Sequence, residues 1–432
     1  MTAAEPVPPL PRNPLLAASG TYPFARLSTA RAQVVRRAET PTLIDLGVGE
    51  PREPTPELVR RALVQAVEDE AISTYPLAVG LPELRVAIAE WAGRRFGTRL
   101  DADRHVLPTL GSKELVFGLA QVLVDRDGGR DLVAVPQPAY PVYERGARFA
   151  GAEVLELPLR AERDYLPDLD AITDEQWSRL VLLWVNYPNN PTAAVADRGW
   201  YAEAAARCRA HGVVLASDEA YSELWFTGGA PDSALQIADD GDGLDGVLVV
   251  NTLSKRSSMP GYRSGFVAGD AALVDALKRY RPSVGVAPQA VIQRAAVAAW
   301  GDEAHVDEVR DRYRAKLAVL QPGLDALGLR DAGGPASFFR WLALPDGWRD
   351  RGWAVATLRD PAVRALAATL TDGAPDEDGS ATFAAALLAH GVVVAPGGFF
   401  GPAGGGHVRV ALVPTLEDCA RACERLQTLA AA

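Results

Sequence analysis

The sequence predicts an α/β protein in which a mostly parallel sheet, flanked by helices, is followed by a smaller α+β domain. Two observations predict this fold. Short apolar runs that end in polar residues alternate with stretches of helical periodicity, a pattern typical of βα units in a parallel sheet. From about residue 310 the pattern changes to a long helix and separated strands. The clearest apolar runs cover residues 131–136, 179–188, 212–221 and 246–255.

The elements follow one another in a consistent order. Residues 1–60 are predicted to form an N-terminal arm and part of the small domain, and the proline-rich start lacks the basic and then apolar order of a signal peptide. Residues 61–305 are predicted to form the large domain, with amphipathic helices such as 197–212. Residues 306–432 are predicted to form the small domain. Within it, the acidic stretch 371–380 is predicted to be a turn region without assignable chemistry.

Composition limits the classes of partner. The 432-residue chain carries 44 Lys and Arg against 55 Asp and Glu, a formal net charge of -11. This charge disfavours nucleic acid or an anionic membrane as the main partner, so a small molecule is expected. No run of 18 apolar residues occurs. Cys208, Cys419 and Cys423 have no further ligands at metal spacing, so no metal site is predicted, and they are interpreted as buried thiols in a reducing, cytoplasmic compartment.

Four residues with special chemistry lie at the ends of the predicted strands: Tyr140, Asn190, Asp218 and Lys255. In open α/β sheets ligands bind at the carboxyl ends of the strands, so these side chains are expected to converge. An amine that can form a Schiff base and a carboxylate that can keep a pyridine nitrogen protonated are the groups expected for pyridoxal phosphate. A single lysine after a strand is more often a solvated loop residue. The prediction therefore depends on all four residues together.

A phosphate site is predicted where Gly111, Ser112 and Lys113 open an amphipathic helix, because the N-terminal amides and the dipole of a helix favour an anion. Glycine and serine at a helix start are also ordinary caps, and the sequence leaves that alternative open. Arg263, eight residues after Lys255, would add a charge-assisted contact to the same phosphate.

Six segments resemble the class I/II aminotransferases of fold type I, and the resemblance covers nearly the whole chain. The segments are "LGVGEP" (46–51), "STYPLAVGLPELRVAIAEW" (73–91), "NYPNNPT" (186–192), "SDEAY" (217–221), "TLSKRSSMPGYRSG" (252–265) and "HVRVAL" (407–412). The resemblance implies a seven-stranded large-domain sheet like that of aspartate aminotransferase. Ala193 stands where the family usually has glycine, which leaves less room for an unusual backbone angle.

The resemblance also implies a role for each motif residue. Lys255 would form the Schiff base with the cofactor and move the proton, Asp218 would bind the ring nitrogen, and Tyr140 would stack on the ring. Asn190 and Tyr221 would bind the ring hydroxyl. The residues implied around the phosphate are Gly111, Ser112, Lys113, Thr252, Ser254, Arg263 and, from a second subunit, Tyr75. Arg409 would bind the substrate carboxylate beside the backbone of Gly49.

The finer resemblance is to succinyldiaminopimelate aminotransferases of the actinobacterial type, and less to L,L-diaminopimelate aminotransferases. It implies ping-pong amino transfer between N-succinyl-L,L-diaminopimelate and 2-oxoglutarate. Arg26 or Arg52 is a candidate for the remote carboxylate, although either alone is more often a solvated arginine. A homodimer is expected, with residues 281–300 at its interface or in a buried helix. A broad-range aminotransferase, a pyridoxal-phosphate-dependent β-lyase and a non-enzymatic effector-binding domain stay as alternatives.

Overall fold

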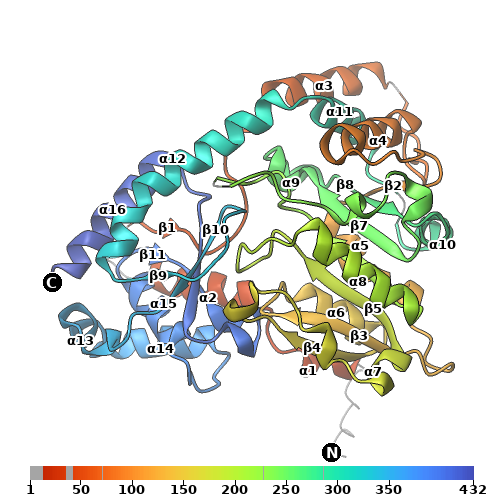
Figure 1. The fold of residues 1–432 in the computed structure, drawn as a ribbon. Coiled ribbons are helices and arrows are strands. Elements are labelled where there is room, and N and C mark those ends of the chain that lie inside the picture. Colours follow the sequence, from red (N-terminus) through yellow and green to blue (C-terminus); the bar gives the residue numbers. More distant parts are fainter. Residues whose placement is uncertain (1–12, 36–41, 71, 227, 286) are drawn as a thin grey trace, which may run out of the picture.

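Figure 1 shows the computed structural model, which describes residues 13–35, 42–70, 72–226, 228–285 and 287–432. Its largest sheet has the strand order β2-β8-β7-β6-β5-β3-β4, and among these described strands only β8 runs against its neighbours. The strands are β2 (Val106–Thr109), β3 (Leu132–Gln137), β4 (Glu153–Pro158), β5 (Leu180–Asn186), β6 (Val214–Asp218), β7 (Val247–Thr252) and β8 (Gly265–Gly269). The four apolar runs predicted from the sequence are β3, β5, β6 and β7, and the mostly parallel sheet is confirmed.

Helices cover both faces of this sheet. Every residue of β5 is buried, as expected for a parallel strand that has neither face in water. Leu182 and Trp184 pack into one core cluster, whereas Leu183 and Val185 point into the other. The helices on the side of Trp184 are α5 (Ser112–Leu123), α6 (Val142–Phe149) and α10 (Ala271–Tyr280). Those packed into the opposite cluster include α4 (Pro82–Phe96), α8 (Arg198–Ala210) and α11 (Ala290–Gly301).

A second, antiparallel sheet has the order β12-β13-β10-β9, and β1 pairs with β11 in parallel beside it. The strands are β1 (Ile44–Asp45), β9 (Arg330–Asp331), β10 (Phe339–Ala343), β11 (Val392–Val393), β12 (Ala395–Pro396) and β13 (His407–Ala411). This α+β part joins a strand near the N-terminus to the C-terminal region. The boundaries at residues 60 and 305 stay a prediction.

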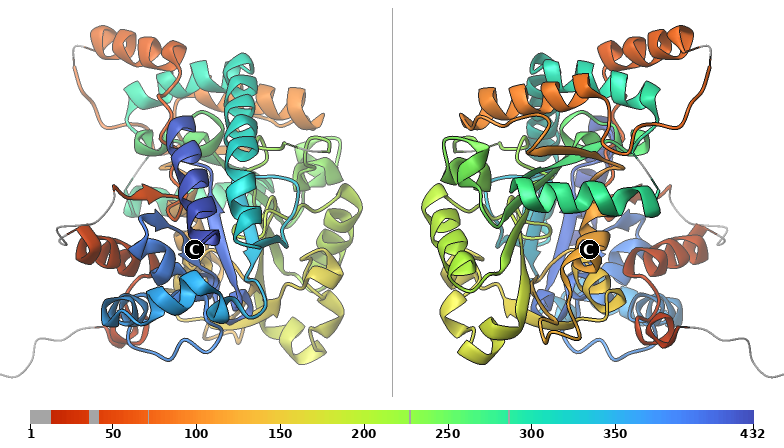
Figure 2. Two further views of the ribbon diagram at one scale, coloured as in Figure 1. Left: turned by 90° about the vertical axis from the view of Figure 1, so that its left-hand side faces the viewer. Right: turned by 90° about the vertical axis from the view of Figure 1, so that its right-hand side faces the viewer.

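Two long helices pack along this smaller sheet. They are α12 (Ala304–Ala326) and α16 (Leu416–Ala430), and Figure 2 shows them side by side. The remaining α-helices are α1 (Pro14–Ala18), α2 (Pro23–Val35), α3 (Glu57–Asp69), α7 (Asp174–Arg179), α9 (Leu253–Arg256), α13 (Gly352–Leu358), α14 (Pro361–Leu370) and α15 (Ser380–Ala389). Because α2 packs against α14, the N-terminal segment lies on the C-terminal part of the chain.

Several predictions for single segments can now be compared with the structure. In the predicted N-terminal arm, residues 14–18 form the short helix α1, because Asn13 caps the helix and Pro14 suits its first turn. Residues 1–12 lie outside the described part. The acidic stretch is a turn whose Asp376 and Asp378 bind the first N–H groups of α15. Within 281–300, one side of α11 packs on α3 and α4, and the role of this segment at a dimer interface stays a prediction.

The expectations about thiols, metals and membranes concern the whole chain. Cys208, Cys419 and Cys423 are free and buried, as predicted. Among the described residues no group of His, Cys, Asp and Glu is arranged to hold a metal ion. None of the described helices combines the length and the apolar character needed to cross a membrane.

Candidate active site

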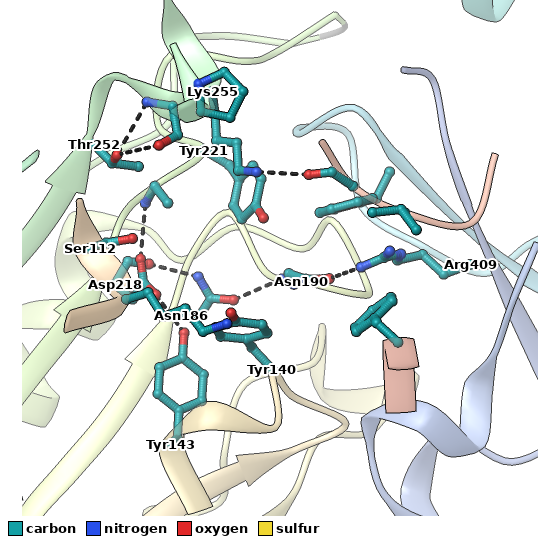
Figure 3. A pocket seen from close by; sticks show the side chains of 18 of the residues that line it. Ser112, Tyr140, Tyr143, Asn186, Asn190, Asp218, Tyr221, Thr252, Lys255 and Arg409 are labelled. Carbon is teal, nitrogen blue, oxygen red and sulfur yellow. Dashed lines mark hydrogen bonds between the residues drawn. The ribbon is translucent and has the colours of Figure 1, made fainter. Parts of the chain in front are cut away.

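A cavity of about 290 Å³ lies beside the carboxyl ends of β5, β6 and β7 (Figure 3). Twelve of the fourteen residues predicted for the site line it: Gly49, Ser112, Lys113, Tyr140, Asn190, Asp218, Tyr221, Thr252, Ser254, Lys255, Arg263 and Arg409. Gly111 lies just behind this lining, against Arg263. Tyr75 does not line the cavity and is 93% exposed, so its predicted contact with a second subunit stays a prediction.

Lys255 is held in the cavity by the turn that follows β7. Thr252 ends this strand, and its hydroxyl accepts a hydrogen bond from the N–H of Ser254, so α9 starts at once and Lys255 projects from its first turn. Nζ of Lys255 donates to the carbonyl of Gly49 at 2.7 Å. Burial, followed by the charge of Arg409, lowers the pKa of Lys255 to about 8. The amine is therefore close to losing its proton near neutral pH.

Asp218 is the last residue of β6 and is fully enclosed by protein. The hydroxyl of Tyr143 donates to Oδ2 of Asp218 at 2.7 Å, and the N–H of Ala220 donates to Oδ1 at 3.2 Å. The amide of Asn186 donates to the backbone carbonyl of Asp218 at 2.7 Å and so holds the end of β6 against β5. Burial raises the pKa of Asp218 to about 6, while the hydrogen bond from Tyr143 acts in the opposite direction.

Arg409 reaches the same cavity from β13 of the second sheet. Its Nη1 donates to Oδ1 of Asn190 at 2.7 Å and its Nη2 to the carbonyl of Gly47 at 2.7 Å. The guanidinium carbon lies 4.1 Å from the ring centroid of Phe339 and 4.7 Å from that of Phe400. Its Nε is buried and has no partner among the described residues. Burial lowers the pKa of Arg409 to about 10, while Tyr221, Tyr22 and the carboxylate of Asp45 act in the opposite direction.

The helix start at α5 forms the opposite end of the cavity. Gly111 is the N-cap of α5 and makes no side-chain cap, so the first N–H groups stay available for an anion. The φ of Gly111 is +72°, a backbone angle that favours glycine, and a Cβ here would displace the guanidinium of Arg263. Ser112 and the paired hydroxyls of Thr252 and Ser254, 2.9 Å apart, complete this anion cradle.

Three further residues named from the sequence can be placed in the structure. Nζ of Lys113 is 5.4 Å from the ring centroid of Tyr22 and 6.0 Å from that of Tyr140, so this amine lies at the mouth of the cavity. Ala193 has a φ of +61°, so the backbone adopts the left-handed angle although a methyl group replaces the usual glycine. Arg52 forms an ion pair with Asp45 at 2.8 Å and does not line the cavity.

Sequence reasoning missed five side chains that complete the site: Tyr22, Phe24, Tyr143, Asn186 and Phe339. Tyr143 could have been found, because it lies three residues after Tyr140, in the first turn of the helix that follows. Tyr22 and Phe24 come from the N-terminal segment and Phe339 from the second sheet. No local pattern marks these three. Arg26, the other arginine considered for the remote carboxylate, lines a neighbouring cavity instead of this one.

The donors and acceptors around the cavity fit pyridoxal phosphate. Asp218 suits a ring nitrogen, Lys255 an aldehyde and the helix start at Ser112 a phosphate, and Arg409 leaves an unpartnered Nε for a carboxylate. The fold and the site therefore define an enzyme that depends on pyridoxal phosphate.

Comparison with known proteins narrows this class. The sequence profile described as "Aminotransferase class I and II" matches residues 41–426. An LL-diaminopimelate aminotransferase of Nitratidesulfovibrio vulgaris is 34% identical over 96% of this chain and 98% of that protein. The crystal structure of an aminotransferase from Neisseria meningitidis is 35% identical, with a TM-score of 0.81, over 97% of this chain and 100% of that one. A probable N-succinyldiaminopimelate aminotransferase from Thermus thermophilus is 30% identical, with a TM-score of 0.77, over 94% of this chain and 100% of that one.

The chain belongs to the class I and II aminotransferase family. It is a pyridoxal-phosphate-dependent aminotransferase, and its substrates are amino acids and oxo acids. This family match sets aside the β-lyase and the effector-binding domain that the sequence left open.

Proposed function

We propose that Lys255, Asp218 and Arg409 carry the transfer reaction in this cavity. When bound, pyridoxal phosphate supplies an aldehyde that reacts with amines and a ring that accepts the electron pair of the substrate α-carbon. Lys255 would release the cofactor to the substrate amine and then move one proton at the α-carbon. The pKa of about 8 supports this role, because an amine that can lose its proton near pH 7 can serve as both base and acid.

Asp218 would hold the positive charge on the ring nitrogen. Its enclosure and its hydrogen bond from Tyr143 support this assignment, since a buried carboxylate needs a cation or donors to stay ionised. Asn190 and Tyr221 would bind the ring hydroxyl, with Tyr140 against the ring. Asn190 also contacts Arg409, so the ring and the substrate carboxylate would be positioned through one side chain.

Arg409 would bind the α-carboxylate of the substrate. Two aromatic rings pack on its guanidinium and two acceptors hold its Nη atoms, so its orientation is fixed before the substrate arrives. The phosphate would lie between Ser112, Thr252, Ser254 and Arg263, at the start of α5.

For the substrate, we infer that the amino donor is LL-diaminopimelate. The match to the LL-diaminopimelate aminotransferase of N. vulgaris, which spans both chains almost completely, is the observation that carries this proposal. The test is a panel of amino donors with 2-oxoglutarate as acceptor: LL-diaminopimelate, its N-succinyl derivative, aspartate, an aromatic amino acid and a branched one. LL-diaminopimelate should give the highest kcat/KM. A tenfold advantage for an apolar donor would show a broad-range enzyme instead.

The N-succinyl derivative is the second candidate, and one feature of the cavity favours it. Asp218 is the only carboxylate among the described residues that line the cavity, and it lies at its closed end. LL-diaminopimelate has a remote ammonium group that needs an acidic partner, whereas the succinyl amide removes this charge and adds a carboxylate. The solved structure from T. thermophilus also supports this candidate. In the same panel, a higher kcat/KM for the N-succinyl donor than for LL-diaminopimelate would identify the N-succinyl derivative as the substrate.

A further inference from the structure

A second cavity, of about 430 Å³, lies next to the first and has no role in the proposed chemistry so far. The two cavities share the side chain of Tyr140. The N-terminal segment lies between them, because Tyr22 and Phe24 line the first cavity while Thr21 and Pro23 line the second. A group bound in the second cavity would therefore be one side chain away from the reaction site.

The wall of the second cavity carries unpaired positive charge. It contains three arginines, Arg26, Arg145 and Arg148, and one acid, Glu144. Nε of Arg148 donates to Glu144 at 2.7 Å, so Arg148 neutralises the charge of Glu144. Within the described ranges, neither Arg26 nor Arg145 forms an ion pair. Burial lowers the pKa of Arg26, the charge of Asp372 acts in the opposite direction, and Arg145 adds to the lowering.

Both unpaired arginines are fixed in place by contacts that leave donors free. Nη2 of Arg145 donates to the carbonyl of Ser19 at 2.8 Å, and its guanidinium carbon lies 5.3 Å from the ring centroid of Tyr22. The guanidinium carbon of Arg26 lies 5.1 Å from the ring centroid of Phe399, and its Nε is buried without a partner among the described residues. Both arginines are half-buried, so an anion between them would gain two charge-assisted contacts partly shielded from water.

Arg145 also connects this charge to the reaction site. It lines an open groove that shares Tyr22, Lys113 and Arg263 with the first cavity. The one acid of that groove, Glu114, accepts a hydrogen bond from the N–H of Leu110 and faces Arg281, so it does not neutralise Arg145. Arg145 therefore lines both the second cavity and this groove, and the groove adjoins the reaction site through Tyr22, Lys113 and Arg263.

We propose that Arg145, with Arg26 behind it, binds the remote carboxylate of the amino donor on the far side of Tyr22 and Tyr140 from Lys255. This inference rests on the proposed function, since both candidate donors are long amino acids with a carboxylate at the other end. Arg409 takes the near carboxylate and the arginine pair takes the far one. The pair makes the enzyme select dicarboxylic donors, and Arg145 and Arg26 are its specificity-determining residues.

The test uses two donors that differ only at the remote end: L-2-aminopimelate, which has the carboxylate, and L-2-aminoheptanoate, which lacks it. Holoenzyme is mixed with each donor without oxo acid, and the change in cofactor absorbance gives the rate of the first half-reaction. Wild type should prefer aminopimelate at least tenfold. R145Q and R26Q should each lose about tenfold of that preference, through weaker binding of aminopimelate, because a charged hydrogen bond is lost. R145K should keep part of it.

R148Q is the matched control, because Arg148 lines the same cavity but is paired with Glu144. Its preference should equal that of wild type. The proposal is overturned if R145Q keeps the full preference, or if it slows both donors equally. Thermal unfolding of the holoenzyme gives a second measurement: pimelate should raise the midpoint more than heptanoate in wild type and not in R145Q. If wild type rejects LL-diaminopimelate and its N-succinyl derivative but still prefers aminopimelate, the proposed substrate fails and the arginine pair stands.

Discussion

Removing the hydroxyl of Tyr143 tests whether the charge of Asp218 controls the reaction. Tyr143 is fully buried. Its hydroxyl donates the shorter of the two hydrogen bonds to this carboxylate, at 2.7 Å, compared with 3.2 Å for the N–H of Ala220. A hydrogen bond to a charged group contributes about 1.5–3 kcal/mol, which corresponds to about 1–2 pKa units. In the cofactor-free protein the pKa of Asp218 should therefore rise above its value of about 6 in Tyr143→Phe, and in the holoenzyme the same lost hydrogen bond should weaken the carboxylate that faces the ring nitrogen.

The expected result follows from this shift. A carboxyl group that is protonated at pH 7 cannot hold a positive charge on the ring nitrogen, so kcat should fall about tenfold to a hundredfold. The acidic limb of the profile of kcat/KM against pH reports groups of the free enzyme. In Tyr143→Phe this limb should move to higher pH by about 1–2 units, and activity should partly return at alkaline pH.

Tyr187→Phe is the matched control for this experiment. Tyr187 is also buried, its hydroxyl donates to the carbonyl of Tyr165 at 2.6 Å, and it does not line the cavity. Both variants lose one buried hydrogen bond, so Tyr187→Phe should lose about 1 kcal/mol of stability and Tyr143→Phe about 1.5–3 kcal/mol. Only Tyr143→Phe should shift the pH profile. If its profile and its kcat stay within twofold of wild type, Asp218 does not depend on Tyr143 and the reasoning is refuted.

Four further predictions concern the other site residues. Borohydride reduction of the holoenzyme and peptide mapping should place the cofactor on Lys255, and an adduct on Lys113 would contradict the assignment. In the cofactor-free protein the pKa of Lys255 is about 8 instead of the usual 10.5. Between these two pH values the unfolded state binds more protons than the folded state, so the free energy of unfolding should rise with pH. Lys255→Met should remove this rise. Arg409→Lys loses the planar two-point contact and should raise KM for amino donors at least tenfold without changing the cofactor spectrum. Tyr75→Phe should weaken cofactor binding if the neighbouring subunit supplies this hydroxyl, whereas an active monomer in sedimentation with unchanged affinity would contradict the shared site.

The sequence alone determined the large sheet and the part of the site that lies at the carboxyl ends of its strands. Asn190, Asp218 and Lys255 directly follow or end buried apolar strands, and parallel strands place their carboxyl ends at one edge of the sheet. Local order in the sequence therefore predicted proximity in space. The helix start at Gly111 and Ser112 was predictable for the same reason, since it depends only on neighbouring residues.

The tertiary structure alone decided what surrounds the substrate. Phe24 and Phe339 reach the guanidinium of Arg409 from segments more than 60 residues away from it, so no periodicity in the sequence could bring them together. The charges also depend on folding. Arg26 and Arg52 look alike in the sequence, but Arg52 forms an ion pair with Asp45, whereas Arg26 lines a cavity and forms no ion pair within the described part of the chain. Whether a charge is neutralised depends on distances between distant segments, and only the folded chain sets these.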